Sequence, residues 1–292
     1  MCDTCGCNIT PGNKHLVEAD GKLAKTEDGK AAVDVLHSLL HENDHQALHN
    51  REHFARHKVL AINLMSSPGS GKTTLLEKTI QNLGDSIKIA VIEGDLETEN
   101  DADRIRNQGA PAVQITTGSA CHLDAHMVHD GLHQLDLTDV DILFIENVGN
   151  LVCPASFDLG HHLNVTLLSS TEGDDKPSKY PVMFRAADLM LITKSDLLQY
   201  LDDFDPKAAE ANFRKLAKDN PVIELSSKTD EGFEQWLSWL KDTLALHLEK
   251  LSNGETMRPA IQADGVELHA HQHSHSHAHS HDHVHDHIHN KA

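Results

Sequence analysis

The stretch Ser66-Ser67-Pro68-Gly69-Ser70-Gly71-Lys72-Thr73-Thr74 follows the apolar run 59–65 and precedes the helical sequence Leu75-Leu76-Glu77-Lys78. A strand, a glycine-rich turn and a helix in this order point backbone N–H groups of a helix N-terminus at a phosphate. Lys72 adds a positive charge, and the Thr73 hydroxyl is a ligand for Mg²⁺. Ser66 stands where the common motif has its first glycine. The alternative is a bare glycine-rich turn; we expect nucleotide binding by Gly69, Ser70, Gly71, Lys72, Thr73 and Thr74.

Short apolar runs separated by helix-length segments surround this loop. Such runs are typical of strands in a mostly parallel sheet that is covered by helices on both faces. The fold class predicted is therefore α/β, doubly wound. The runs are residues 59–65, 87–92, 112–115, 142–145, 165–168, 189–192 and 222–225.

The remaining sequence divides the chain into five parts. Residues 1–30 form a thiol-rich tip followed by a linker from residue 8, and residues 31–57 form one long helix with apolar residues at helical spacing. Residues 58–251 form the nucleotide-binding domain, 252–268 a second linker, and 269–292 a low-complexity tail. The last helix, about 231–251, should close the fold with one apolar face. That face holds Trp236, Leu237, Leu240, Leu244 and Leu248, and the apolar positions of the first helix are Val35, Leu36, Leu39, Leu40 and Leu48.

A second element predicts which base is bound. Thr193-Lys194-Ser195-Asp196 ends a predicted strand and is similar to the N-K-x-D element of GTPases, with Thr193 in place of Asn. A carboxylate at Asp196 accepts hydrogen bonds from guanine N1 and its exocyclic amine, and the Lys194 stem lies along the base. The sequence Ser226-Ser227-Lys228, after the last strand, resembles the small-residue loop that supports the base. A surface Lys/Asp pair is the alternative; we expect GTP and GDP as ligands.

Two carboxylates end strands close to the expected γ-phosphate. Asp95 and Glu146 are candidates, with Lys72, for catalysis, and both carboxylates are candidates with Thr73 for binding Mg²⁺. Gly149 is expected to sense the γ-phosphate through its amide. The sequence does not separate a base at Asp95 from a metal ligand, and carboxylates that cap the following turns are the alternative.

Two groups of soft ligands predict metal binding. Cys2, Cys5 and Cys7 place three thiols within six residues, a donor set for Ni²⁺ or Zn²⁺, with a transient disulfide as the alternative. Cys121, His122 and Cys153 offer a second set that leaves one coordination position open for a second copy of the chain. An ordinary buried cysteine or a capping histidine is the alternative for each of these residues alone.

Histidine is the outlier of the composition, with 25 of 292 residues. His37, His41, His45, His49, His53 and His57 recur every four residues of the first helix, so neighbouring pairs can chelate an ion, or the row is simply a solvated polar face. His126, His129 and His133 have a similar helical spacing. The tail is expected to store divalent ions weakly. Its ligands are His269, His271, His273, His275, His277, His279, His281, His283, His285, His287 and His289.

Charge and hydropathy restrict the partners. The chain carries 25 Lys and Arg against 45 Asp and Glu, a formal net charge of −20, which disfavours nucleic acid and anionic membrane surfaces. No apolar run approaches the roughly 18 residues of a spanning helix, and the first residues lack a signal region. Five cysteines cannot all pair, and we expect a cytoplasmic protein.

These motifs together resemble the HypB family, the hydrogenase nickel-incorporation GTPases. The resemblance rests on Cys-x-x-Cys-Gly-Cys at the start, Asn50 to Phe54, the phosphate loop, Glu93-Gly94-Asp95, Thr117-Gly118 through Cys121-His122, and Glu146 to Pro154. It covers essentially everything before the tail. It implies a P-loop fold of the dimeric SIMIBI type, slow regulatory GTP hydrolysis, and a GTP-dependent homodimer.

The resemblance also implies the metal sites and partners. It assigns high-affinity nickel to Cys2, Cys5 and Cys7, and nickel or zinc to Cys121, His122 and Cys153 near the dimer interface. It implies a HypA-type metallochaperone and the precursor of a [NiFe]-hydrogenase large subunit as partners. Two alternatives remain, a urease accessory GTPase and a nickel storage protein with a vestigial nucleotide site.

Overall fold

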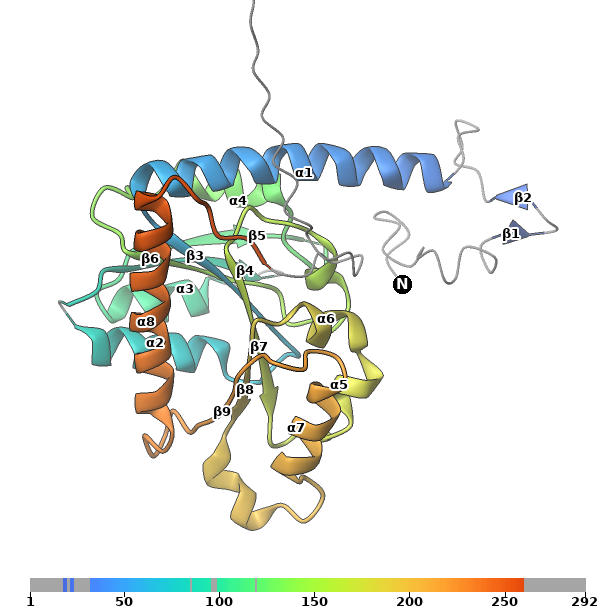
Figure 1. The fold of residues 1–292 in the computed structure, drawn as a ribbon, viewed down its shortest axis with the longest axis vertical. Helices are drawn as coiled ribbons and strands as arrows, with labels where there is room; N and C mark the ends of the chain where they lie inside the picture. Colours follow the sequence, from blue (N-terminus) through green and yellow to red (C-terminus); the bar gives the residue numbers. More distant parts are fainter. Residues whose placement is uncertain are drawn as a thin grey trace, which may run out of the picture.

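The computed structural model of the chain describes residues 18–19, 22–23, 32–84, 86–95, 99–118 and 120–259, with side chains from residue 40 onward (Figure 1). The cysteines of the tip, the side chain of His37 and the histidine tail lie outside the described residues. Among the helices that are described, none is long and apolar enough to cross a membrane.

Seven strands form one sheet in the order β5-β4-β6-β3-β7-β8-β9, and every pairing in it is parallel. The predicted doubly wound α/β fold is therefore confirmed. Each predicted apolar run overlaps a strand. The strands are β3 (Leu60–Ser66), β4 (Ile89–Asp95), β5 (Ala112–Thr116), β6 (Ile142–Glu146), β7 (Leu163–Ser169), β8 (Leu189–Thr193) and β9 (Val222–Glu224).

Helices cover both faces of this sheet because successive residues of each strand point to opposite faces. Ile142 and Phe144 of β6 pack into one hydrophobic cluster with α2, α3 and α8, whereas Leu143 and Ile145 pack into the other with α1 and α4. The helices are α1 (Ala32–His57), α2 (Lys72–Leu83), α3 (Asn100–Asn107), α4 (Ala125–Leu132), η2 (Cys153–Ser156), α5 (Lys176–Lys179), α6 (Pro181–Ala186), η3 (Ser195–Tyr200), α7 (Pro206–Arg214) and α8 (Phe233–Ser252).

The long helix α1 is fixed across one end of the molecule by buried polar side chains (Figure 1). Asn50 is fully buried, and its Nδ2 donates to the carbonyls of Ala125 (2.8 Å) and Leu159 (3.1 Å). Arg51 forms a buried ion pair with Asp158 (2.8 Å). A buried amide or guanidinium is costly unless it is paired, so these contacts specify where α1 lies. These contacts explain why Asn50 and Arg51 are buried polar residues in an otherwise amphipathic helix.

Two sequence expectations need correction. Leu248 is 39% exposed and Leu48 is 43% exposed, so neither extends the buried face of its helix. In α8 the buried position of that turn is His247 instead, because the helix rotates this residue toward the sheet. The linker expected over residues 8–30 includes an antiparallel pair, β1 (Glu18–Ala19) with β2 (Lys22–Leu23).

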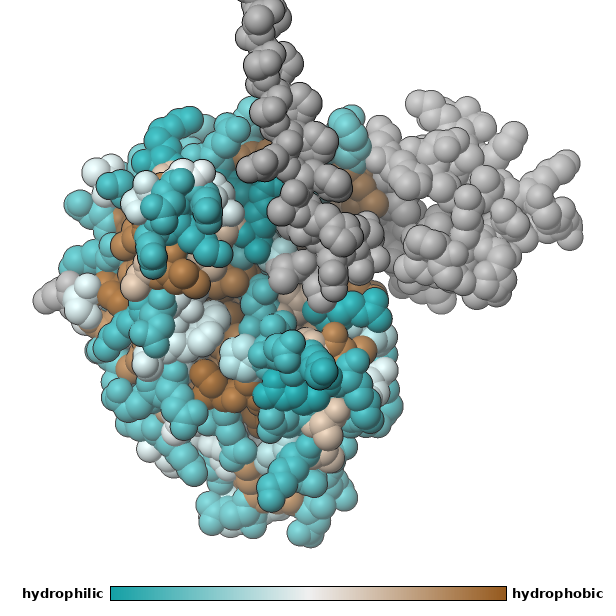
Figure 2. All heavy atoms as spheres, in the orientation of Figure 1, coloured by the Kyte–Doolittle hydropathy of each residue, from teal (hydrophilic) through white to brown (hydrophobic). Residues whose placement is uncertain are grey.

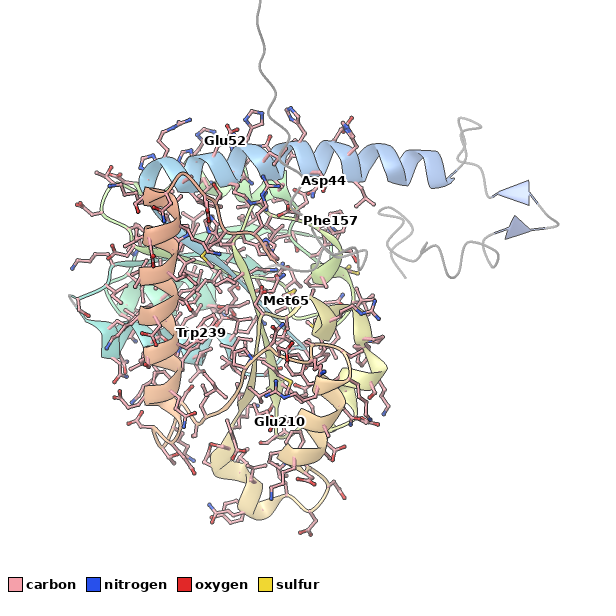
Figure 3. The ribbon with its side chains drawn as sticks, in the orientation of Figure 1. Asp44, Glu52, Met65, Phe157, Glu210 and Trp239 are labelled. Carbon is pink, nitrogen blue, oxygen red and sulfur yellow. The ribbon has the colours of Figure 1, made fainter. Side chains whose placement is uncertain are left out.

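The surface carries most of the polar residues. Figure 2 shows that hydrophilic residues predominate on the visible face and that hydrophobic ones lie mainly in hollows between elements. Figure 3 labels Trp239 on α8, whose ring stacks on the buried Trp236 with centroids 5.6 Å apart. The apolar face of α8 therefore closes one side of the sheet, as the sequence predicts.

Three histidines are buried where α1 and α8 meet the sheet. His162 accepts a hydrogen bond from the Ala61 amide (2.9 Å), and its ring lies 4.4 Å from that of His247. Burial lowers the pKa of His161 and of His247 to about 4, and that of His162 well below its ordinary value. All three are therefore neutral in the folded protein at pH 7.

Acid should destabilise the fold through these side chains. Their folded pKa lies below the unfolded value of about 6.5, so their stabilising contribution is complete above that pH and is lost as the pH falls toward 4. His247→Leu removes one such group, and we expect the slope of unfolding free energy against pH to decrease by about 1.4 kcal/mol per pH unit in this window. Denaturant titrations from pH 4.5 to 7 measure it, and an unchanged slope contradicts the assignment.

Candidate functional site

The carboxyl ends of the parallel strands meet at one edge of the sheet, and the glycine-rich loop follows β3 there. Gly69 and Gly71 have φ of 75° and 98°, which only glycine adopts without strain, so the loop turns tightly into α2 at Lys72. Lys72 Nζ donates to Ser66 Oγ (3.1 Å), and Ser66 is fully buried. The serine that replaces the usual glycine therefore holds the lysine of the loop.

A cavity of about 540 Å³ lies over this loop. It brings together side chains from the ends of several strands, as expected for a ligand site in an open parallel sheet. Thr73 Oγ1 donates to Glu146 Oε1 (2.9 Å), so the hydroxyl and the carboxylate expected to hold Mg²⁺ are in contact. The predicted residues lining the cavity are Gly69, Gly71, Lys72, Thr73, Thr74, Asp95, Glu146, Gly149 and Lys194.

The chemistry of these groups fits a divalent cation. Glu146 is buried, and its Oε2 has no hydrogen-bond partner in the described part of the chain. Burial raises the pKa of Glu146 to about 7, although Lys72 and the Thr73 hydroxyl oppose this shift. A cation at this carboxylate would supply the missing partner and favour the ionised form. Thr73 and Glu146 are therefore suitable ligands, and Asp95 lines the same cavity.

Glu93 belongs to this site although it was not among the predicted site residues. Glu93 of β4 pairs in register with Glu146 of β6, and both side chains are buried. Burial and the neighbouring Glu146 raise the pKa of Glu93 to about 8. Asp95 is recognisable from its place at the strand end, but only the strand order shows that Glu93 lies beside Glu146. The site thus holds a second carboxyl group that is mainly protonated at neutral pH.

A second cavity, of about 250 Å³, adjoins the first and contains the predicted base-binding residues. The two share Gly71, Thr74 and Lys194, so together they can accommodate an extended ligand such as a nucleotide. The predicted residues of this cavity are Ser70, Lys194, Asp196, Ser227 and Lys228.

Three hydrogen bonds hold residues of this second cavity in place. Ser226 Oγ donates to Asp196 Oδ1 (2.7 Å), and the same hydroxyl oxygen accepts the Lys228 amide (3.1 Å). Thr193, which stands where GTPases have asparagine, donates through Oγ1 to the Ser70 carbonyl (2.8 Å). Thr193 therefore ties the base loop to the phosphate loop. Ser226 belongs to the loop that was expected to support the base, but the sequence does not predict its contact with Asp196, which spans 30 residues.

Asparagine side chains connect three central strands. Asn63 Nδ2 of β3 donates to Asn164 Oδ1 of β7 (2.9 Å), and Asn147 Nδ2, just after β6, donates to Asn63 Oδ1 (3.2 Å). Asn147 Oδ1 in turn accepts the amide of Leu123 (3.1 Å). This asparagine ladder, defined by Asn164, Asn63 and Asn147, ends beside His122. No sequence motif indicates it.

The second group of expected metal ligands is gathered at that turn. The candidate ligand atoms of Cys121, His122 and Cys153 all lie within 4.8 Å of one another, which we call the thiolate cluster. Burial lowers the pKa of His122 and keeps its ring neutral, as metal binding requires. The ring stacks on Phe157, 4.0 Å between centroids, which lies below α1 in Figure 3. Two sulfurs and one nitrogen suit Ni²⁺ or Zn²⁺.

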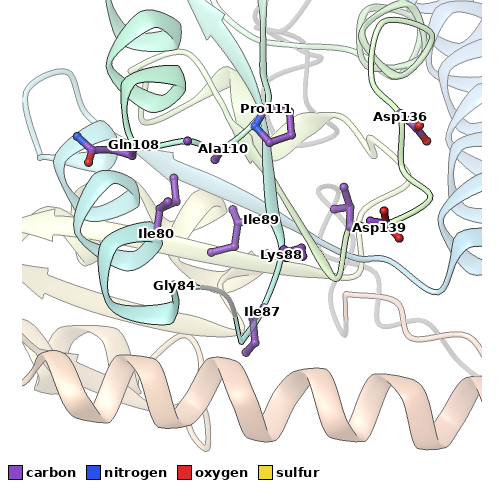
Figure 4. A pocket seen from close by; sticks show the side chains of 12 residues that line it. Ile80, Gly84, Ile87, Lys88, Ile89, Gln108, Ala110, Pro111, Asp136 and Asp139 are labelled. Carbon is purple, nitrogen blue, oxygen red and sulfur yellow. The ribbon is translucent and has the colours of Figure 1, made fainter.

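Another cavity, of about 480 Å³, lies at the opposite edge of the sheet (Figure 4). It is lined by the amino ends of β4 and β5, with Ile80, Ile89 and Pro111 among its residues. Ligands of open parallel sheets bind at the carboxyl ends of the strands instead. The position of this cavity, at the amino ends of the strands, therefore argues against it as the functional site.

Comparison with known proteins places these features in a family context. Residues 60–224 match the profile of the CobW/HypB/UreG nucleotide-binding domain family. The hydrogenase maturation factor HypB of Escherichia coli is 54% identical over 209 residues, which is 72% of each chain.

Two solved structures are similar to the described fold. One is HypB from Helicobacter pylori in complex with nickel, with a TM-score of 0.67, 42% identity, and coverage of 74% of this chain and 97% of that one. The other is the hydrogenase maturation factor HypB from Archaeoglobus fulgidus, with a TM-score of 0.66, 41% identity, and coverage of 70% and 100%.

A methyl group at Gly149 should weaken nucleotide binding. A Cβ there would lie 2.8 Å from Pro68 Cα, so the backbone of the phosphate loop must shift. We expect Gly149→Ala to lower nucleotide affinity by about tenfold, the low end of the cost of overpacking. Gly131→Ala is the control, because its Cβ would meet only the ends of isoleucine side chains at 3.2 Å. Titration of a fluorescent nucleotide measures both variants; equal affinities would contradict the close packing of Gly149.

Proposed function

The chain belongs to the CobW/HypB/UreG family and, within it, to the HypB hydrogenase maturation factors, and from this we propose that it is a GTP-hydrolysing nickel metallochaperone. It would deliver Ni²⁺ to the precursor of a [NiFe]-hydrogenase large subunit, in the cytoplasm, where thiol ligands stay reduced. The observation that carries the proposal is the hydrogen bond from the Leu123 amide to Asn147, which joins the thiolate cluster to the nucleotide cavity.

In this proposal the phosphate loop binds GTP and the strand ends organise its hydrolysis. Lys72 and the loop amides hold the phosphates, and Asp196 reads the guanine. Bound Mg²⁺, on Thr73 and Glu146, would neutralise charge that develops on the phosphates. Asp95 lines the phosphate cavity and is our candidate for orienting the attacking water. Gly149 is packed so closely against Pro68 of the phosphate loop that it has no room for a Cβ, and it is the candidate γ-phosphate sensor.

Nickel is the cargo rather than a resident cofactor. The thiolate cluster supplies three ligands and leaves a position that a second copy of the chain would fill in a GTP-dependent homodimer. The side chain of Leu123 also packs against Gly94, which lines the phosphate cavity, because a Cβ on Gly94 would lie 2.7 Å from it. Movement of β4 or of the segment after β6 on GTP binding would therefore shift His122. We assign the remaining roles to a HypA-type partner, to Cys2, Cys5 and Cys7 as a nickel-loading tip, and to the tail at 269–292 as a store.

Nucleotide state should change the nickel affinity of the thiolate cluster. We would compare GDP with a non-hydrolysable GTP analogue, each with Mg²⁺, in a Cys2/Cys5/Cys7→Ser variant with a competing chelator that suppresses weak histidine sites. We expect a difference of about 5- to 150-fold, the usual range of coupling between sites. Asn147→Ala should reduce this difference more than it reduces the affinity itself, because it breaks the link to Leu123. Identical affinities in both nucleotide states would instead favour the storage function.

Base preference tests the GTP assignment separately. Asp196→Asn replaces an acceptor by an amide that donates, so it should favour xanthine, which presents a carbonyl where guanine has its amine. We expect the preference for guanosine diphosphate over xanthosine diphosphate to fall by on the order of 100-fold or more. Ser226→Ala is the matched control, since it loosens Asp196 without changing its chemistry and should weaken both ligands. Competition against a fluorescent nucleotide gives the ratio, and an unchanged ratio removes Asp196 from base recognition.

A further inference from the structure

Helices α1 and α4 lie side by side, and each presents histidines one turn apart (Figure 1). On α1 the rings of His53 and His57 are stacked with centroids 4.9 Å apart. On α4 the rings of His129 and His133 meet edge to face at 4.6 Å. These four residues, which we call the histidine patch, share no member with the thiolate cluster. The proposed function leaves them without a role.

The hydrogen bonds of Asn50 fix the tautomer of His129. Asn50 Nδ2 donates to two backbone carbonyls, so its Oδ1 is available only as an acceptor. His129 Nδ1 lies 3.2 Å from that oxygen and must therefore carry the proton. Its Nε2 then carries a lone pair. Histidines that bind metals are oriented in the same way, by donating their other ring N–H to a carbonyl oxygen.

The two outer nitrogens of the α4 pair point at each other. His129 Nε2 and His133 Nε2 are 3.1 Å apart. Two imidazoles bound to one ion at about 2.0–2.1 Å have their nitrogens about 3 Å apart, so the observed separation matches a shared metal. Without an ion, a single N–H···N hydrogen bond occupies the same geometry. A cation that replaces that proton would leave the two nitrogens at about the same separation.

His53 lies one turn of α1 beyond Asn50, which contacts His129, so His53 is on the same face of that helix. Burial is the largest cause that lowers the pKa of His53. The charges of His57, Arg56, His129 and His133 lower this pKa further. The pKa of His129 is lowered in the same manner, by burial and then by His133, while Asp130 opposes the shift. The lowered pKa values of His53 and His129 favour their neutral rings, which is the form that binds a cation.

We propose that His129 and His133 chelate a divalent transition-metal ion of the Ni²⁺ or Zn²⁺ class on the α1–α4 surface, with His53 as a third ligand. Imidazole nitrogen suits these ions, and water completes the coordination of so exposed a site. The site stands apart from the nucleotide-dependent function, since it needs neither the phosphate loop nor the cysteines.

Zn²⁺ titration of the full chain tests this site directly. Diethyl pyrocarbonate modifies free imidazoles, and peptide mass spectrometry reports the modification at each histidine. We expect His129, His133 and His53 to become protected together, at lower Zn²⁺ than the exposed His41 of α1. His133→Gln should raise the Zn²⁺ needed to protect His129 by on the order of 100-fold, because the second tethered ligand is lost. His133 follows the last residue of α4 and is exposed, so glutamine should be tolerated there.

Two control variants make the outcome unambiguous. His41→Gln removes a histidine from α1 outside the patch and should leave the protection of His129 unchanged. Cys121→Ser should also leave it unchanged; loss of protection there would show that the two sites are one. Protection of His129 only at the Zn²⁺ concentration that protects His41, or protection unaffected by His133→Gln, overturns the chelate. A His53 that stays reactive while the pair is protected removes the third ligand.

Discussion

The asparagine ladder is the constraint on which the functional edge of the sheet depends. Asn63, Asn147 and Asn164 are buried, and each amide must be paired because an unpaired buried polar group costs about 1–3 kcal/mol. Pairing them with one another fixes the register of β6, β3 and β7 more strictly than apolar contacts do, since those tolerate sliding. The phosphate loop leaves β3 and Glu146 ends β6, so the ladder sets their separation. The contact between Thr73 and Glu146 follows from it.

The asparagine ladder also connects the phosphate cavity to the turn that carries His122. Asn147 uses its amide nitrogen toward Asn63 and its amide oxygen toward Leu123, so it cannot shift without loss at one end. Leu123 in turn packs against Gly94, next to Glu93 and Asp95. The turn that carries His122 is thereby held at two points of the phosphate cavity. Coupling between sites requires such an element with two arrangements, and the free energy it transmits acts equally in both directions.

The sequence predicted the sheet well because each strand of a doubly covered parallel sheet is a short, continuous apolar run, which is hard to mistake next to amphipathic helices. It predicted the phosphate loop because that chemistry is local in the chain. Glu93 was missed for the opposite reason, since its role arises from Glu146 on a neighbouring strand. Likewise, helical periodicity placed Leu248 in the core, but the rotation of α8 buries His247 there. Contacts between distant segments decide such positions, and a single sequence does not report them.

The two proposed metal sites differ in ligand type, and this difference would set a direction of metal transfer between them. Thiolates bind Ni²⁺ and Zn²⁺ more strongly than a pair of exposed imidazoles that share the ion with water. The thiolate cluster is also largely buried, which strengthens the interaction of a cation with charged sulfur. An ion held first at the histidine patch would therefore move spontaneously to the thiolate cluster and not back. Helix α4 begins at Ala125, three residues after His122, and His129 and His133 lie toward its far end, so one short helix connects the thiolate cluster to these two histidines. In the proposed function, release from the thiolate cluster would then be the step that needs the nucleotide.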